Sequence, residues 1–182
     1  MTVEMLKGKW KNNKKLHQLM KSKKGLKISG RLEYPLYDLD PRISEFYLWH
    51  GTKNDTVPIL TLSGMPTEKM ADPHHSLYGL GMYFAENSSK SSDYTSKTSV
   101  RKMILFRVAL GEIYYTKQQL IGLKFPNAAD PLFPDKSFKT FDSVVADKNT
   151  VKDHGNNQVH REFILFETSQ CYPEFVVTFK PR

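Results

Sequence analysis

Three short, separated segments of this 182-residue chain place polar or charged side chains beside apolar runs. Such side chains can donate, accept or exchange protons, and a carboxylate next to an apolar strand is costly unless it has a function. Each of them also has an ordinary structural explanation, as a core tyrosine, a serine that caps a helix or a solvated strand-edge glutamate. The candidate residues are His50, Gly51, Thr52, Tyr83, Lys90, Ser91, Tyr94 and Glu162.

The elements that must position these residues are short. An N-terminal cap at Asp55 predicts a helix near 56–63 that Gly64 ends, and a second, polar helix is predicted at 88–94. Ser91 and Tyr94 are three residues apart, so they share one face of that second helix. A turn is predicted around Tyr172-Pro173. The predicted strands cover residues 46–49, 82–85, 103–110, 113–116 (continuing the previous strand after a kink), 143–146, 163–166 and 175–179.

Six or seven short strands with two or three short helices predict the fold class. So few crossover helices argue against a doubly wound parallel sheet. We therefore expect an α+β domain built from two packed, mainly antiparallel sheets, with loops at 65–79, 122–139 and 147–159. Hydrophobic residues make up 39% and charged residues 25% of the chain, which excludes collagen-like, disordered and membrane classes.

The sequence does not match the common cofactor-binding and metal-binding motifs. Gly79-Leu80-Gly81 begins a dinucleotide fingerprint, but Phe84 stands at the third glycine. A single cysteine, Cys171, excludes an internal disulfide and argues against a cysteine-based zinc site. We expect Cys171 to be packed rather than nucleophilic, and the adjacent histidines 74 and 75 to lie in a surface loop.

Together the three segments resemble the catalytic domain of the poly(ADP-ribose) polymerase family, which belongs to the diphtheria-toxin-like ADP-ribosyltransferases. The matching blocks are LWHGT (48–52), GMYFAENSSKSSDY (81–94) and HREFILFE (160–167) followed by CYPEFVV (171–177). They occur in the family's order and cover about residues 45–180. Within the family, the second and third blocks are most similar to tankyrase.

The resemblance implies glycosyl transfer with NAD as substrate. We expect no metal, because the short segment between Tyr94 and Arg101 lacks the cysteines of the tankyrase-type zinc site. Nicotinamide leaves the ribose, and an acceptor captures the ADP-ribose. We expect a transferase that can elongate poly(ADP-ribose) chains on a protein acceptor, which can be the enzyme itself. The alternatives are a mono-ADP-ribosyltransferase of protein or nucleic acid, and an inactive module that binds NAD or the polymer.

The resemblance also assigns residues to the nicotinamide end of NAD. The backbone of Gly51 would pair with the carboxamide, where glycine permits a close approach. The Ser91 hydroxyl would bind the same carboxamide, Tyr94 would stack on the ring, and Tyr83 would close the other side. Thr52, next to Gly51, is counted with this group.

Three further residues are assigned to the ribose and phosphate groups. His50 would bind the 2′-hydroxyl of the adenosine ribose. Glu162 would bind the nicotinamide ribose, stabilise the developing cation and orient the acceptor hydroxyl. Lys90 would be a partner of Glu162 or of the pyrophosphate.

Charge is concentrated at the start of the chain. Residues 1–31 hold nine lysines and Arg31 against Glu4, a net charge of +9, whereas the rest has −1 of the total of +8. We predict a basic, partly helical segment at 1–30, with a helix near 10–22, followed by a catalytic domain at 31–182. A solvated end that favours solubility is the preferred interpretation over a nucleic-acid-binding arm.

The remaining expectations concern the setting of the protein. No run of about 18 apolar residues occurs, and the first residues lack the apolar core of a secretory signal. We therefore expect no membrane partner, an intracellular location in the cytoplasm or nucleus, and a monomer.

Overall fold

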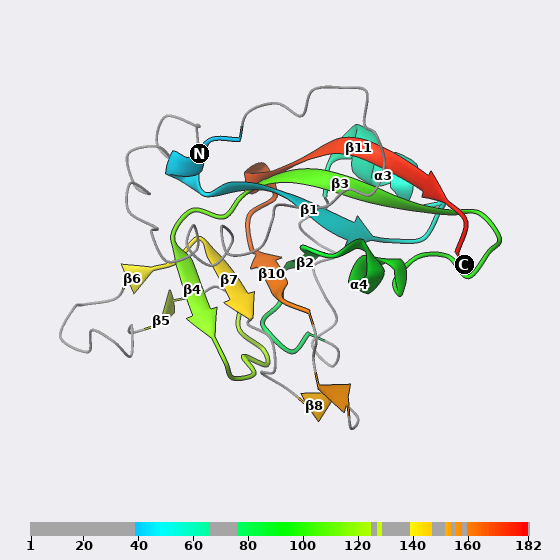
Figure 1. Cartoon of the computed structure of the whole chain (residues 1–182). Helices are drawn as coiled ribbons and strands as arrows, with labels where there is room; N and C mark the ends of the chain where they lie inside the picture. The colour runs from blue at the N-terminus through cyan, green and yellow to red at the C-terminus, as the bar shows by residue number, and fades with distance from the viewer. Residues whose placement is uncertain are drawn as a thin grey trace.

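The computed structural model describes residues 39–65, 76–124, 127–128, 139–146, 152–153, 156–157 and 160–181 (Figure 1). The helical segments are η1 (Pro41–Ile43), α3 (Val57–Ser63), α4 (Ser88–Ser92) and η3 (Thr168–Gln170). Within these ranges, no helix has the length and apolar character needed to cross a membrane. The strands are β1 (Glu45–Gly51), β2 (Met82–Ala85), β3 (Arg101–Ala109), β4 (Ile113–Thr116), β5 (Asn127–Ala128), β6 (Lys139–Thr140), β7 (Ser143–Ala146), β8 (Lys152–Asp153), β9 (Asn156–Asn157), β10 (Glu162–Leu165) and β11 (Cys171–Phe179).

Seven strands form one mixed sheet in the order β11-β3-β1-β2-β10-β7-β4. All neighbours are antiparallel except β4 and β7, which are parallel. The halves β11-β3-β1 and β2-β10-β7-β4 meet at one residue pair, Trp49 opposite Ala85. The predicted α+β class and its mainly antiparallel strands are confirmed. The two separate sheets that were predicted are instead one hydrogen-bonded sheet.

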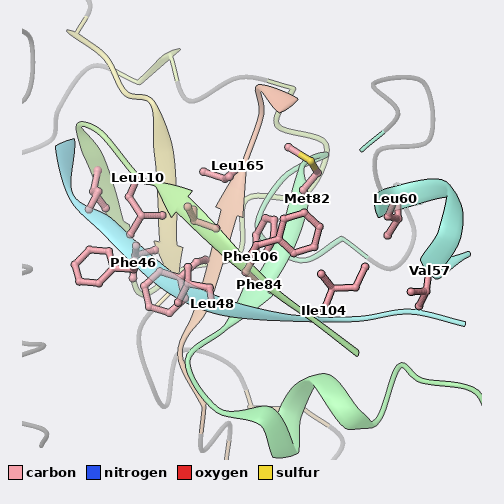
Figure 2. Packing of buried hydrophobic residues seen from close by; sticks show 14 residues of the cluster. Phe46, Leu48, Val57, Leu60, Met82, Phe84, Ile104, Phe106, Leu110 and Leu165 are labelled. Carbon is pink, nitrogen blue, oxygen red and sulfur yellow. The ribbon is translucent and has the colours of Figure 1, made fainter. Parts of the chain in front are cut away.

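The two halves of the sheet share one hydrophobic core (Figure 2). Along β1, Leu48 points into this core and Trp49 points to the opposite face, as strand alternation requires. Phe84 of β2 meets Phe106 of β3 edge to face, with ring centres 5.3 Å apart. Strands β7 and β10 add further side chains to the same cluster. The two halves of the single sheet therefore pack their apolar side chains into the same cluster.

Strand β4 does not continue β3, in contrast to the prediction of one kinked strand. Gly111 between them has a φ of 61°, and the chain turns away there. The Ser143 hydroxyl donates to the carbonyl of Leu110 at 2.6 Å, and the Glu112 N–H donates to Asp142 Oδ2 at 2.9 Å. These bonds fasten the turn to the start of β7, so β4 pairs with β7 instead.

The helix α3 differs from the prediction at its start. Thr56 is the N-terminal cap, without a side-chain capping bond, and its hydroxyl donates to Asp55 Oδ1 at 3.2 Å. The predicted cap at Asp55 is therefore wrong, because Asp55 lies one residue too early. Gly64 ends the helix as predicted, with a φ of 74°.

The predicted turn at Tyr172-Pro173 is also wrong. Both residues lie inside β11, and the register shifts between Pro173 and Phe175. An edge strand tolerates a proline because the missing N–H can face away from the sheet. The chain reverses earlier, at η3.

Several predictions fall outside the described residues. These are the helix near 10–22, the boundary between residues 30 and 31, and the histidines at 74 and 75. The domain division therefore stays a prediction. In the two later predicted loops, the structure contains the small ribbons β5–β6 and β8–β9.

Candidate active site

Helix α4 packs directly on the end of β1. A Cβ atom on Gly51 would lie 1.7 Å from the backbone oxygen of Ser91 and 3.2 Å from the Cβ of Tyr94. Ser91 is buried, and its hydroxyl donates to the carbonyl of Trp49 at 3.0 Å. Glycine is thus required here for the approach of two backbones, and this approach places Ser91 and Tyr94 beside the strand end.

The hydrogen bond of Ser91 refines its predicted role. A hydroxyl has one proton to donate and two lone pairs that accept. Since the proton goes to Trp49, Ser91 in this arrangement can accept from the N–H₂ of a carboxamide. Donating to the carboxamide oxygen instead requires the Ser91 hydroxyl to rotate.

Lys90 links α4 to β10. Its Nζ lies 3.4 Å from Glu162 Oε1 and 5.5 Å from the centre of the Tyr94 ring, and Tyr94 itself is 60% exposed. Burial lowers the pKa of Lys90, but attraction to Glu162 and Tyr94 outweighs it, so the pKa is raised overall. Lys90 is therefore an ammonium at neutral pH. Its contact with the Glu162 carboxylate agrees with the first of its two predicted roles, and the role at the pyrophosphate stays a prediction.

Glu162 is the first residue of β10 and stands between two alanines. Ala85 of β2 and Ala146 of β7 are its cross-strand neighbours. Directly opposed side chains on adjacent strands point to the same face, so the cross-strand neighbours of Glu162 on that face are both small. The Glu162 side chain is 12% exposed. Glu162 is thus a mostly buried carboxylate that is paired with Lys90 and flanked by small side chains on both neighbouring strands.

His50 lies on the core side of β1, between aromatic rings. Its ring centre is 5.6 Å from that of Phe84 and 5.9 Å from that of Phe106. Its Nδ1 lies 2.9 Å from the carbonyl of Tyr83, which can only accept, so Nδ1 carries the proton. Burial lowers the pKa of His50, and the Tyr83 bond offsets this only in part. His50 is neutral at pH 7, and Nε2 presents a lone pair.

The Tyr83 hydroxyl holds a neighbouring turn. It accepts from the N–H of Tyr78 at 2.9 Å and donates to the carbonyl of Gly79 at 2.8 Å. Burial raises the pKa of Tyr83, and the charge of Glu162 adds to this. Tyr83 thus acts in the structure as an anchor, while its ring stays on the Glu162 face of the sheet.

The structure divides the predicted residues into two connected groups. One group is joined through α4, β1 and β10, and the other through the bond between His50 and the Tyr83 backbone. Thr52 follows β1 directly and is half-buried. The α4 group consists of Gly51, Lys90, Ser91, Tyr94 and Glu162.

Among the described residues, no group of three or more histidine, cysteine, aspartate or glutamate side chains could hold a metal ion. Metal independence stays a prediction, because the described residues are only part of the chain. Cys171 packs against the core, and burial raises the pKa of its thiol to about 12. The thiol is protonated at neutral pH, which agrees with the expected structural role.

Two polar pairs beside Glu162 were missed by the sequence analysis. Arg161 Nη1 lies 3.3 Å from Glu86 Oε2, and His160 Nδ1 lies 3.1 Å from Asn87 Nδ2. All four residues lie in the matching blocks 81–94 and 160–167, but the sequence alone does not indicate which of them contact one another. The register of β2 against β10 is the signal that would have found them.

Comparison with known proteins identifies the family. A family model of the poly(ADP-ribose) polymerase catalytic domain matches residues 4–181. The human protein mono-ADP-ribosyltransferase PARP12 is 28% identical over 138 residues, which cover 75% of this chain and 17% of that protein. The resemblance and the ADP-ribosyltransferase fold are confirmed, whereas the closer likeness to tankyrase stays a prediction. This chain belongs to the poly(ADP-ribose) polymerase catalytic-domain family.

Proposed function

We propose that this chain takes ADP-ribose from NAD, releases nicotinamide and transfers the ADP-ribose to an acceptor. The observation that carries the proposal is the Glu162 carboxylate, which is mostly buried, lies 3.4 Å from Lys90 and has small neighbours. Membership of the family supports the same reaction.

The nicotinamide end of NAD would lie beside the junction of β1 and α4. The Gly51 backbone and the Ser91 hydroxyl offer hydrogen bonds to the carboxamide, and Tyr94 offers an exposed ring for stacking. His50 would face the adenosine ribose, whose hydroxyl can donate to its Nε2 lone pair. Thr52 would line the path between these ends.

The reaction breaks the bond between C1′ of the ribose and the nicotinamide nitrogen. The electron pair leaves with nicotinamide, and positive charge develops on the ribose. Glu162 would stabilise that charge, which exists mainly in the transition state. An acceptor oxygen then forms the new bond to C1′, and its proton passes to Glu162. Lys90 would hold the carboxylate in place between these events.

We propose transfer of single ADP-ribose units as the product. The human relative is named a mono-ADP-ribosyltransferase, and no comparison supports the elongation expected from the sequence. Elongation remains the second candidate because Glu162 could orient a ribose hydroxyl as the next nucleophile. The acceptor would be a protein, including this chain, with the nucleic-acid end as the alternative.

Incubation with labelled NAD and gel electrophoresis tests the proposal. A sharp labelled band at the size of the chain is the expected result. A high-molecular-weight smear would establish elongation instead. Label on an added oligonucleotide alone would assign nucleic acid as the acceptor. An unlabelled gel together with NAD binding would identify an inactive binding module and contradict the proposed function.

A further inference from the structure

The backbone pairing of β10 ends at the catalytic candidate itself. Glu162 is the last paired residue toward the N-terminal side, both with Ala85 of β2 and with Ala146 of β7. Strand ends open more readily than strand centres. A carboxylate at such an end therefore depends on other contacts to keep its position.

Two side-chain pairs continue the alignment of β2 with β10 beyond this point. Arg161 lies opposite Glu86 with Nη1 and Oε2 3.3 Å apart, and the Arg161 and Glu86 side chains are only 5% and 8% exposed. His160 lies opposite Asn87 one step further, with 3.1 Å between the side-chain nitrogens. The pairing is thus carried on by side chains after the backbone ladder stops.

Two ion pairs lie in this region. The chain at β10 supplies the positive charge of one pair and the negative charge of the other. Arg161 and Glu162 are adjacent in an extended chain, so their side chains point to opposite faces. Arg161 contacts Glu86, just after β2, whereas Glu162 contacts Lys90 of α4. A slip of one residue would put Glu162 opposite Glu86, which brings like charges together.

A buried ion pair is an expensive way to gain stability alone. The loss of hydration can exceed the attraction, and an apolar pair of similar volume often stabilises a protein as well or better. In some proteins, buried charges instead specify a single register. We propose that Glu86 and Arg161 are positioning residues, which fix β10 against the segment leading into α4 so that Glu162 stays at Lys90 and faces the reacting ribose. This inference rests on the proposed function.

Three variants of the full chain test the inference. They are Glu86→Gln, the double variant Glu86→Leu/Arg161→Met, and the control Arg107→Met. Arg107 of β3 contacts Glu45 and Glu174 at 3.7 and 3.5 Å, so the control removes a charge from another ion-pair cluster. The measurements are kcat and KM for NAD, the melting temperature, and the affinity for benzamide.

We expect Glu86→Gln to lower kcat at least about tenfold with KM and benzamide affinity changed less than about twofold. The double variant should regain the melting temperature but not kcat. The control Arg107→Met should have a lower melting temperature and an unchanged kcat. Recovery of kcat together with melting temperature in the double variant would overturn the inference, as would an unchanged kcat in Glu86→Gln.

An NMR titration of the Lys90 side chain gives a readout that needs no activity. If Glu162 moves away in Glu86→Gln, its attraction for the ammonium is lost while the effect of burial remains, so the pKa of Lys90 falls. An unchanged Lys90 titration would contradict the positioning role. If the wild-type chain transfers no ADP-ribose, the proposed function is what fails, and this titration then decides the positioning role by itself.

Discussion

The negative charge of the Glu162 side chain is what stabilises the transition state in the proposed reaction. Glu162→Gln keeps the size and one acceptor oxygen but removes the charge. Because the lost interaction belongs to the transition state, we expect kcat and kcat/KM to fall together by at least about 100-fold, with little change in KM. Initial-rate kinetics with labelled NAD measure this. Any chain growth should suffer more than the first transfer.

Glu167→Gln is the matched control for this change. Glu167 follows the other end of β10 and is exposed. It should keep the wild-type rate. A Glu162→Gln variant as active as this control would show that Glu162 is only a strand-edge carboxylate.

Ser91 and Tyr94 should separate ligand affinity from stability. Ser91→Ala removes a buried hydrogen bond to Trp49 as well as a ligand contact, so it should lower unfolding free energy by about 1–3 kcal/mol and weaken benzamide several-fold. Tyr94→Ala should weaken benzamide more through lost stacking, yet cost little stability because Tyr94 is 60% exposed. Calorimetric titration and thermal melts check both. Equal benzamide affinity in the wild type and both variants would show that the nicotinamide site lies elsewhere.

His50 should make the folded state sensitive to mild acid. Its pKa is lowered by burial, so the unfolded chain binds a proton near the usual value of 6.5 while the folded chain does not. Stability is full above that value and falls as pH drops below it, by at most about 1.4 kcal/mol per pH unit. Urea unfolding at several pH values should show this slope in the wild type and its loss in His50→Gln. Parallel curves for the two proteins would contradict it.

At the level of elements, the contact between β1 and α4 leaves no space for a residue larger than glycine at position 51. Gly51→Ala would put a methyl group 1.7 Å from the Ser91 oxygen, so α4 must move. Such overpacking costs about 1–3 kcal/mol, and each kcal/mol lowers the melting temperature of a chain this long by about 2–4 °C. Benzamide binding should be lost with it. Gly64→Ala, at a helix end with open space, should cost stability without affecting benzamide.

Local sequence patterns predicted most elements because their causes are local. The apolar runs at β2, β4 and β7 gave the strand bounds found in the structure. The partners of those runs depend on contacts distant in sequence. The turn at Gly111 and its bonds to the start of β7 send β4 to a different neighbour. Pro173 suggested a turn, but an edge strand accommodates it.

The site shows the same division between local and distant causes. Ser91 and Tyr94 could be placed together because helical spacing is fixed. Glu86 and Arg161 could not be paired, since that requires the register of β2 against β10. The hydroxyl bonds of Tyr83 to a turn four and five residues earlier likewise appear only in the folded chain.

At the scale of the whole molecule, the net charge is distributed unevenly along the chain, and this bears on the binding of polyanions. Residues 1–31 carry a net +9 and the remainder −1, so we expect any attraction to nucleic acid to arise from the first segment. That segment holds Trp10 for stacking and Arg31 as its only arginine, a poor set for base contacts. Binding through lysine alone is nonspecific and depends on counterion release.

We therefore expect weak, salt-sensitive binding of a DNA duplex that vanishes at physiological salt. Affinity should fall at least about 10³-fold between about 0.05 and 0.2 M salt in a fluorescence titration. Replacing the nine lysines of residues 1–27 with glutamine should abolish the low-salt binding and leave transfer of ADP-ribose unchanged, because these lysines are distant in sequence from Glu162. Replacing exposed Lys117 and Lys124 should change neither. Saturable binding that persists at about 0.2 M salt, or loss of transfer to an added oligonucleotide in the glutamine variant, would instead make the basic segment a docking arm for nucleic acid.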